Sequence, residues 1–170
     1  MRNTILSKRI GHWTVLLCLA LLLASGCGFL QKAMGDPFEG RWIGIAQVPG
    51  IGDSLLRIQI EPTGNEKYFV RILADGYHLI NSEEPEERQV YVWQNLAELS
   101  FTGILESDTL YLSKIMHFSL VLSKVTGRLR LHDGTEIYRD DGKQYPELQK
   151  ELRGIMQKKY PHAQFKDKNG

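Results

Sequence analysis

The stretch SLLRIQIEPTGNEKYFVRIL, residues 54–73, decides the fold of this 170-residue chain. In residues 54–61 and again in residues 67–73, apolar and polar side chains alternate, which is typical of β-strands with one buried face. Between the two runs, Pro62-Thr63-Gly64-Asn65 brings together residues that favour turns. The stretch therefore predicts a β-hairpin.

The same alternation extends on both sides of this hairpin, from residue 40 to about residue 139, with turn residues roughly every eight to twelve positions. A turn is expected at Asp75-Gly76. Further strands are expected at residues 41–48, 77–80, 90–93, 96–105, 110–113 and 117–123. The fold class is therefore all-β, an antiparallel meander of roughly eight to ten strands that forms a sandwich or a barrel, and about eight strands are enough to close a small barrel.

A second hairpin is expected in RLRLHDGTEIYR, residues 128–139. Asp133-Gly134 separates two alternating runs, and this dipeptide favours a two-residue type I′ turn. Leu129 and Leu131 are then expected to point inward, with Arg128 and Arg130 outward. This hairpin would supply the last strands of the meander.

The period changes after Gly142, and residues 146–160 are predicted to form a helix that begins with Pro146. Its apolar face has helical spacing, so that it either packs on the sheet or binds a partner. The members of this face are Leu148, Leu152, Ile155 and Met156. Residues 161–170 are polar and are expected to be a flexible tail, so the barrel domain with its helix spans residues 37–160.

The N-terminus has the composition of an export signal. A basic start is followed by the apolar run WTVLLCLALLLA, residues 13–24, which is too short for the roughly 20 residues of a membrane-spanning helix. Residues 23–27, Leu-Ala-Ser-Gly-Cys, resemble the lipobox of bacterial lipoproteins. That resemblance implies a signal peptide over residues 1–26, lipidation of Cys27, and a lipidated tether over residues 27–36. Gly28, where an Asp would favour the inner membrane, implies an outer-membrane protein that faces the periplasm.

Composition limits the partners and the chemistry. The chain has 21 basic and 20 acidic residues, and removal of the signal leaves 18 against 20, which argues against nucleic acid as a partner. The lipobox resemblance implies that Cys18 leaves with the signal and that Cys27 takes the lipid, which accounts for both cysteines. The exported domain then has no thiol for a disulfide, a nucleophile or a metal.

Gly40-Arg41-Trp42, at the start of the first strand, is similar to the Gly-x-Trp that opens the barrel of lipocalins and related calycins. The resemblance implies a calycin-like barrel in which Trp42 plugs one end and a late arginine lies across its ring. Arg139 is the expected partner of Trp42 in this barrel-end pair, with Arg130 as the alternative. A helix after the barrel also fits the order of elements in lipocalins.

No pattern of catalytic or cofactor-binding residues emerges, and we expect a protein that is not an enzyme, with no catalytic residues, no cofactor and no metal. The four histidines outside the signal show no metal-ligand spacing; they are His78, His117, His132 and His162. The acidic loop of residues 81–87 invites a calcium site, but its spacing matches no cation-binding loop and a solvated turn is expected.

Two functions remain open. The barrel would bind a small apolar ligand inside, between strand faces such as Leu56, Ile58 and Ile60, unless these side chains fill a solid core. Alternatively, the outer surface would bind an envelope protein, as in an assembly factor or a periplasmic inhibitor. Three aromatic residues are candidates for that surface, or for a place under the helix: Tyr91, Trp93 and Tyr111.

Overall fold

The computed structural model describes residues 36–113 and 118–167, and from Phe38 onward they belong to one compact unit. Cys27, the signal and most of the tether lie outside the described residues, and so does His117. The elements are β1 (Gly40–Val48), β2 (Gly52–Gly64), β3 (Lys67–Leu79), the short helix η1 (Glu86–Arg88), β4 (Val90–Glu106), β5 (Thr109–Ser113), β6 (Phe118–Leu122), β7 (Leu129–Leu131), β8 (Glu136–Arg139), α2 (Gln144–Lys159) and β9 (Gln164–Lys166).

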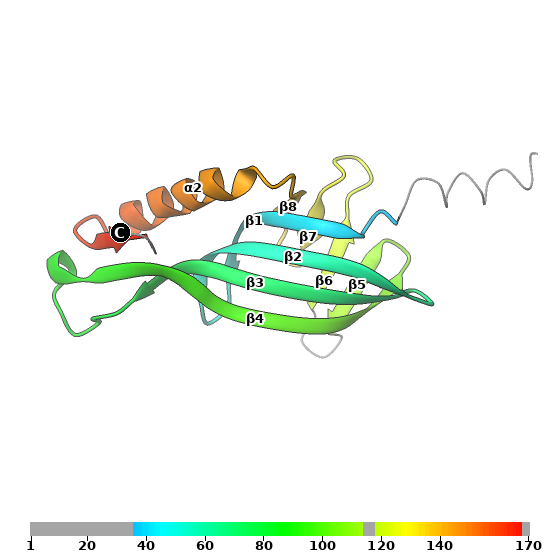
Figure 1. Ribbon diagram of the computed structural model, residues 1–170, viewed down its shortest axis with the longest axis horizontal. Coiled ribbons are helices and arrows are strands. Elements are labelled where there is room, and N and C mark those ends of the chain that lie inside the picture. The colour runs from blue at the N-terminus through cyan, green and yellow to red at the C-terminus, as the bar shows by residue number, and fades with distance from the viewer. Residues whose placement is uncertain (1–35, 114–117, 168–170) are drawn as a thin grey trace, which may run out of the picture. The chain divides into compact units, whose positions relative to one another are not determined.

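Eight strands form a closed antiparallel barrel (Figure 1). Each strand from β1 to β8 pairs with the next along the chain, and β8 returns to pair with β1. Two residue pairs make this closing contact, Trp42 with Arg139 and Ile43 with Tyr138. The predicted fold class, an all-β meander with a C-terminal helix, is confirmed, and the barrel rather than the sandwich is the correct alternative.

The β2–β3 hairpin forms in the expected place, but its turn lies further along than predicted. Pro62 still pairs with Tyr68, and β2 continues to Gly64, which pairs with Lys67. Asn65 and Glu66 make the turn, with φ of 52° and 59°. Positive φ at both central residues defines a type I′ turn, whose twist matches that of the strands. The β2–β3 turn therefore has the type that was expected between β7 and β8.

The turn between β7 and β8 is different from the prediction. Leu131 N–H donates to the carbonyl of Thr135, which leaves a loop of three residues. Only Gly134 has a positive φ, of 88°, while Asp133 accepts a hydrogen bond from Thr135 N–H at 2.9 Å. The expected type I′ turn is wrong, because a three-residue loop needs only one left-handed residue. Leu129 and Leu131 point inward as predicted.

The expected turn at Asp75-Gly76 is also wrong, since β3 runs through it without a break. β4 is likewise one strand of 17 residues rather than two strands. The two strands pair along their length except at one β-bulge. Ala74 pairs with Ala97 and Asp75 pairs with Asn95, which leaves Leu96 as an extra residue on β4.

The bulge changes the face to which β4 presents its side chains. Before it, Tyr91 and Trp93 face a core beneath α2; after it, the odd-numbered residues from Ala97 onward face the barrel interior. Without the extra residue, the strict alternation of a strand would place both sets on one face. One pair of strands thus serves two separate hydrophobic cores.

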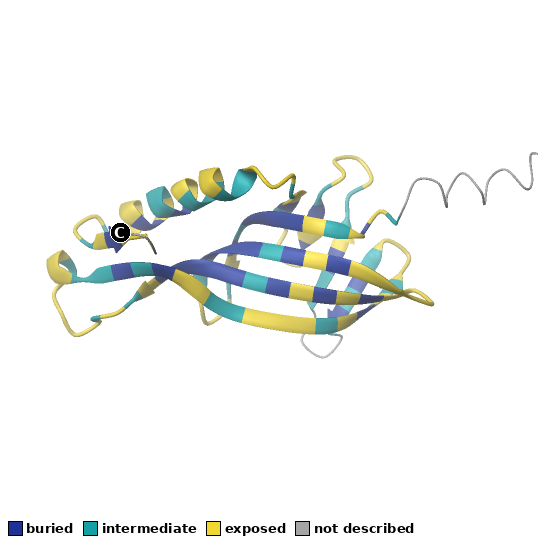
Figure 2. Cartoon of the chain, viewed as in Figure 1, coloured by how far each residue is buried: buried dark blue, intermediate teal, exposed yellow. Residues whose placement is uncertain are grey.

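Buried and exposed bands alternate along β2 and β3 (Figure 2), as the hairpin pattern predicts. The barrel core includes Trp42, Ile58, Val70, Leu120 and Ile137, each at most 1 % exposed. The second core lies on the outer side of the barrel wall, under the helix. Its buried members are Ile43, Leu55, Tyr77, Tyr91, Trp93, Leu152, Met156 and Phe165.

α2 begins at Gln144, two residues before the predicted start, and ends one residue before the predicted end. In Figure 1 it runs beside the ends of β3 and β4 that project from the barrel. Leu152 and Met156 are buried and Leu148 is half-buried, but Ile155 is 36 % exposed and does not belong to the packed face. The helix therefore packs on the sheet. None of the helices in the described ranges is both long and apolar enough to cross a membrane.

The segment after α2, expected to be a flexible tail, contains β9, which pairs in parallel with residues 90–92 of β4. Phe165 anchors it, because its ring stacks on Tyr91 at 5.2 Å and is 8 % exposed. Arg153 of α2 also donates to the Phe165 carbonyl at 2.9 Å. The sequence pattern missed this strand because a single apolar residue carries no periodicity.

Candidate functional site

Trp42 fills the end of the barrel at which β1 begins. Its side chain is 1 % exposed, and its indole Nε1–H donates to the Phe38 carbonyl at 2.9 Å. Arg139, on the neighbouring strand β8, places its guanidinium carbon 4.3 Å from the centre of the indole ring. Its Nη1 also donates to the Glu39 carbonyl at 2.7 Å. Arg130 lies elsewhere, beside Glu136.

Two features of the structure require a glycine at position 40, the first residue of the Gly-x-Trp run. Gly40 has a φ of 126°, which side-chain-bearing residues rarely adopt. A Cβ at this position would also lie 2.8 Å from Nη1 of Arg139. The small residue therefore lets the arginine cross the strand and reach the indole, so that this end of the barrel is closed.

The opposite end holds a cavity of about 300 Å³. It is reached where β1 ends and at the tip of the β7–β8 hairpin, and its walls are the inner faces of β1 to β4 with the start of β6. Its lining is predominantly apolar: Ala46, Val48, Pro49, Ile51, Leu56, Ile72, Ala74, Ala97, Leu99, Phe101, Phe118 and Leu131, with Gln47, His132 and Asp133 as the polar members.

The exposure of Leu99 shows that the cavity is open. Leu99 lines the cavity yet is 47 % exposed. Phe101 and Phe118 meet edge to face at 5.6 Å and lie against the barrel core. The barrel is thus solid near Trp42 and hollow near Leu99. Both alternatives from the sequence, a filled core and a cavity, are present in different halves.

Polar groups occur only at the rim of the cavity. Gln47, His132 and Asp133 are all exposed. Although burial acts to raise the pKa of Asp133, the hydrogen bonds from Thr135 and the nearby His132 outweigh it and lower that pKa. An apolar interior with a polar rim suits a ligand that is apolar over most of its surface.

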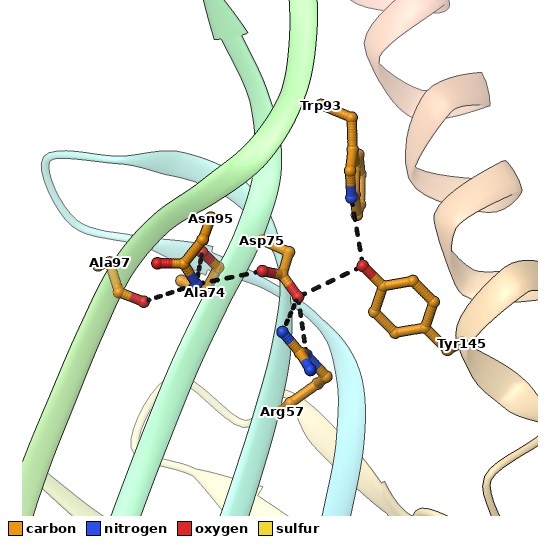
Figure 3. A network of polar contacts seen from close by, with 7 residues as sticks. All are labelled: Arg57, Ala74, Asp75, Trp93, Asn95, Ala97 and Tyr145. Atoms are coloured by element: carbon orange, nitrogen blue, oxygen red, sulfur yellow. Dashed lines mark hydrogen bonds and ion pairs between the residues drawn. The ribbon is translucent and has the colours of Figure 1, made fainter. Parts of the chain in front are cut away.

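A polar network centred on the buried Asp75 supports one wall of the cavity (Figure 3). The Asn95 amide donates to the carbonyls of Ala74 and Ala97 at 3.5 and 3.4 Å, on either side of the bulge. The same nitrogen also approaches Asp75 Oδ1 at 3.2 Å. Because Ala74 and Ala97 both line the cavity, this amide fixes the width of the wall at the bulge.

Asp75 is the centre of the network and is 3 % exposed. Its Oδ2 accepts hydrogen bonds from Nε and Nη2 of Arg57, both at 2.7 Å, and from the Tyr145 hydroxyl at 3.5 Å. The Trp93 indole donates to that same hydroxyl at 3.2 Å. Burial is the main cause of the raised pKa of Tyr145, which keeps its hydroxyl protonated as a donor. The network therefore ties the start of α2 to the bulge.

Sequence reasoning missed Asp75, Asn95 and Tyr145. The pair Asp75-Gly76 has the composition of a turn, and nothing local reveals that it lies inside a strand. Gly76 is there because a Cβ would meet the bulged Leu96 side chain at 2.7 Å. The signal that could have found the site lies in β3, where the apolar positions change from even-numbered (Tyr68, Val70 and Ile72) to odd-numbered (Tyr77 and Leu79).

The remaining candidate residues do not converge on a site. His78, His132 and His162 are exposed and lie on different elements. Over residues 36–113 and 118–167, no three His, Cys, Asp or Glu residues are close enough to hold a metal ion. Tyr91 and Trp93 lie under α2, the second of the two places expected for them, and Tyr111 is half-buried on β5.

Comparisons with known proteins add nothing to this description, which rests on the geometry of the structure alone. No family model matches the chain, and searches of curated proteins and of solved structures find no significant similarity. The class that the fold defines is a closed eight-stranded antiparallel barrel with a C-terminal helix, an architecture compatible with a lipocalin-like domain.

Proposed function

We propose that this chain is a cell-envelope lipoprotein whose lipocalin-like barrel binds a small apolar molecule, and that it is a binding protein rather than an enzyme. The cavity carries the proposal. At about 300 Å³ it is at the lower end of the range of ligand sites, and its lining is almost entirely apolar. A compact ring system or a short hydrocarbon chain is the class of ligand that fits such a space.

The binding experiment uses residues 36–170, because this segment contains the whole barrel, both cores and α2. The probe is N-phenyl-1-naphthylamine, a neutral fluorophore whose emission rises in an apolar environment. We expect saturable binding, and we expect mass spectrometry of the purified domain to find a co-purifying small molecule.

Leu99→Trp is the test variant, since its larger ring would occupy the mouth of the cavity. Ser100→Trp is the matched control, because Ser100 is the next residue on the same strand and faces outward. Binding should be lost in the first variant and kept in the second. Equal binding by both variants, or no saturable binding by the wild-type domain, would show that the cavity is not a ligand site.

The location rests on the resemblance of residues 23–27 to a lipobox. Lipidation of Cys27 would hold the barrel at the membrane, and Gly28 favours the outer membrane, facing the periplasm. In a bacterial host, the intact mass of the mature chain should correspond to a start at Cys27 with added acyl groups. Cys27→Ser should give an unprocessed precursor that is sorted wrongly; normal processing and membrane partitioning of this variant would refute the anchor.

One observation favours a protein-interaction function instead. Phe69 and Ile104 are 41 % and 43 % exposed on the outer wall formed by β3 and β4. Ile104 pairs across strands with Tyr111, so the three side chains share the outward face. If the cavity variant leaves the biological role of the protein intact while Phe69→Ser abolishes it, the outer wall rather than the cavity carries the function.

A further inference from the structure

The projecting ends of β3 and β4 have two outer edges, and only one of them is covered by a strand. On the β4 side, β9 adds three residue pairs to residues 90–92. On the β3 side, the last pair with β2 is Leu55 with Asp75. In the part of the chain that the structure describes, residues 76–79 therefore pair with β4 alone. This open edge is a place where main-chain hydrogen-bonding groups are available.

The register shows which main-chain groups are directed to the open edge. Ile80 N–H donates to the Val90 carbonyl, so Ile80 turns its main-chain groups toward β4. Successive residues of a strand turn these groups to opposite sides, so Gly76 and His78 also face β4. Tyr77 and Leu79 then direct both N–H and C=O away from β4, toward the side on which β2 has ended.

A cleft of about 420 Å³ lies along this edge. One wall is the tip of the β1–β2 hairpin and the other is the C-terminal end of α2. Its lining includes the open edge itself: Gly50, Ile51, Gly52, Asp53, Tyr77, His78, Leu79, Tyr91, Leu96, Met156, Lys159 and Tyr160. In contrast to the barrel cavity, this cleft presents more polar than apolar surface, as expected where main-chain groups line it.

We propose that the cleft binds an extended peptide segment of another protein, which adds to β3 as an edge strand. Main-chain hydrogen bonds to Tyr77 and Leu79 would supply the affinity, and alternate side chains of the peptide would lie against Met156, Lys159 and Tyr160. The open edge is four residues, about 13 Å long, which matches a short strand. The β9 strand shows that the opposite edge of the same ribbon already accepts such an addition.

The geometry favours a single strand over a second copy of this chain. The edge lies between the hairpin tip and α2, so the cleft suits one extended segment better than the edge of another sheet. Lys159 Nζ and Asp53 Oδ2 form an ion pair at 3.5 Å that joins α2 to the tip of the β1–β2 hairpin, and a bound peptide would exchange this pair for contacts with its own side chains. Burial, together with the nearby Tyr160 and Glu86, raises the pKa of Tyr91 to about 12, so that its hydroxyl stays a donor.

The test selects binders to the full-length protein from a displayed library of random peptides about ten residues long, which covers the length of ordinary strands. Hydrogen exchange of the complex should then show new protection at the amides of Tyr77 and Leu79. Leu79→Pro should weaken binding about tenfold, because it removes one of these donors at an edge position, where proline is tolerated.

A second pair of variants guards against misfolding of the proline variant. Lys159→Trp should fill the cleft and weaken binding at least as much, while Lys158→Trp, the exposed neighbouring residue outside the cleft, should leave it unchanged. Three outcomes overturn the proposal: a library without binders, binders that protect other amides, and concentration-dependent self-association that protects Tyr77 and Leu79 in the absence of peptide.

Discussion

Arg139 closes the barrel by covering an indole that is already buried. The guanidinium is itself exposed, so its attraction to the ring of Trp42 is partly screened by water. Its hydrogen bond to the Glu39 carbonyl holds the segment before β1 in place. Through these two contacts, the Arg139 side chain of β8 binds both β1 and the segment that precedes it, and so joins the two strands that close the barrel.

We expect Arg139→Ala to lower the free energy of unfolding by about 1 kcal/mol, the sum of a screened cation–π contact and one hydrogen bond. The stability of Arg139→Lys should lie between those of the wild type and Arg139→Ala, because lysine keeps the charge but has no planar group to stack. Urea unfolding is the measurement, with Arg130→Ala as the control for loss of a surface arginine. Equal losses for the two alanine variants would mean that the contact with Trp42 contributes nothing.

Glu66 is a side-chain-bearing residue in the left-handed region, with a φ of 59°. Glu66→Gly should raise the free energy of unfolding by about 0.5–1 kcal/mol, because glycine adopts this conformation without strain and Asn-Gly is the preferred type I′ pair. Thermal unfolding measures the change. Glu66→Ala removes the carboxylate but keeps the strain, so it should not stabilise; a gain as large as that of glycine would refute the explanation.

At the scale of elements, the ribbon of β3 and β4 depends on Asp75, whose carboxylate joins β2, the bulge and α2. Asp75→Ala leaves Tyr145 without its acceptor and Arg57 without its ion pair, while Asn95 keeps its contacts with the Ala74 and Ala97 carbonyls. Since Arg57 is 40 % exposed and regains water, the expected loss is about 2 kcal/mol rather than the 3–5 kcal/mol of a fully buried pair.

A double-mutant cycle separates the ion pair from the rest of the network. Arg57→Ala with Asp75→Ala should be less destabilised than the sum of the two single variants, by roughly 1 kcal/mol. Chemical denaturation gives these values, and near-ultraviolet circular dichroism, to which Trp93 contributes, reports whether α2 is still docked. Strict additivity would show that Arg57 and Asp75 do not interact energetically.

The β7–β8 hairpin carries a pH-dependent contribution. The hydrogen bond from Arg128 to Glu136, at 2.7 Å, lowers the pKa of the Glu136 carboxyl from its usual 4.5, and the nearby Arg130 adds to the effect. A carboxyl with a lowered folded-state pKa stabilises the fold above its unfolded pKa, and this stabilisation is lost as the pH falls through the folded value.

Glu136→Gln should therefore be less stable than the wild type at about pH 7, and the difference should shrink as the pH falls below 4.5 and disappear once the pH is below the lowered pKa of Glu136. Urea unfolding across this range is the measurement. Because both partners are near the surface, added salt should shrink the difference at neutral pH. A difference that persists at low pH would come from something other than charge.

Element by element, the sequence predicted well where a buried face repeats. Residues 54–61 and 67–73 alternate cleanly, and the structure pairs them in register. It predicted poorly at turns, since Asp75-Gly76 has a turn composition that the Arg57–Asp75 ion pair and a bulged leucine override. Asn95 and Tyr145 belong to the candidate site only through contacts across elements, and β9 is fixed by the burial of one phenylalanine; no local pattern records such contacts.

Across the whole barrel, neighbouring strands differ widely in the number of residue pairs that join them. β3 and β4 share thirteen residue pairs, whereas β1 and β8 share two, and β7 and β8 also share two. Both weak contacts lie on the side of the barrel away from the β3–β4 ribbon. The seam at β8 is therefore where the closed sheet is most easily opened.

Native-state hydrogen exchange should show this difference directly. Amides of β7 and β8 are expected to exchange through local opening at a lower free energy than those of β2 and β3, which should approach the global value. Arg139→Ala should lower the protection of β8 more than that of β3, because it loosens the seam. Uniform protection around the barrel would mean that the sheet opens only as a whole.

The bulge at Leu96 has a consequence for how this chain tolerates change. Side chains of a strand alternate between its two faces with a period of two residues. Leu96 is an extra residue that shifts this alternation, so that β4 contributes side chains first to one core and then to the other. Loss or gain of one residue between Val90 and Leu96 would leave each side chain unaltered in chemistry but assign it to the wrong layer. Substitutions can therefore accumulate in either core independently, while the spacing between the cores cannot drift by even one residue.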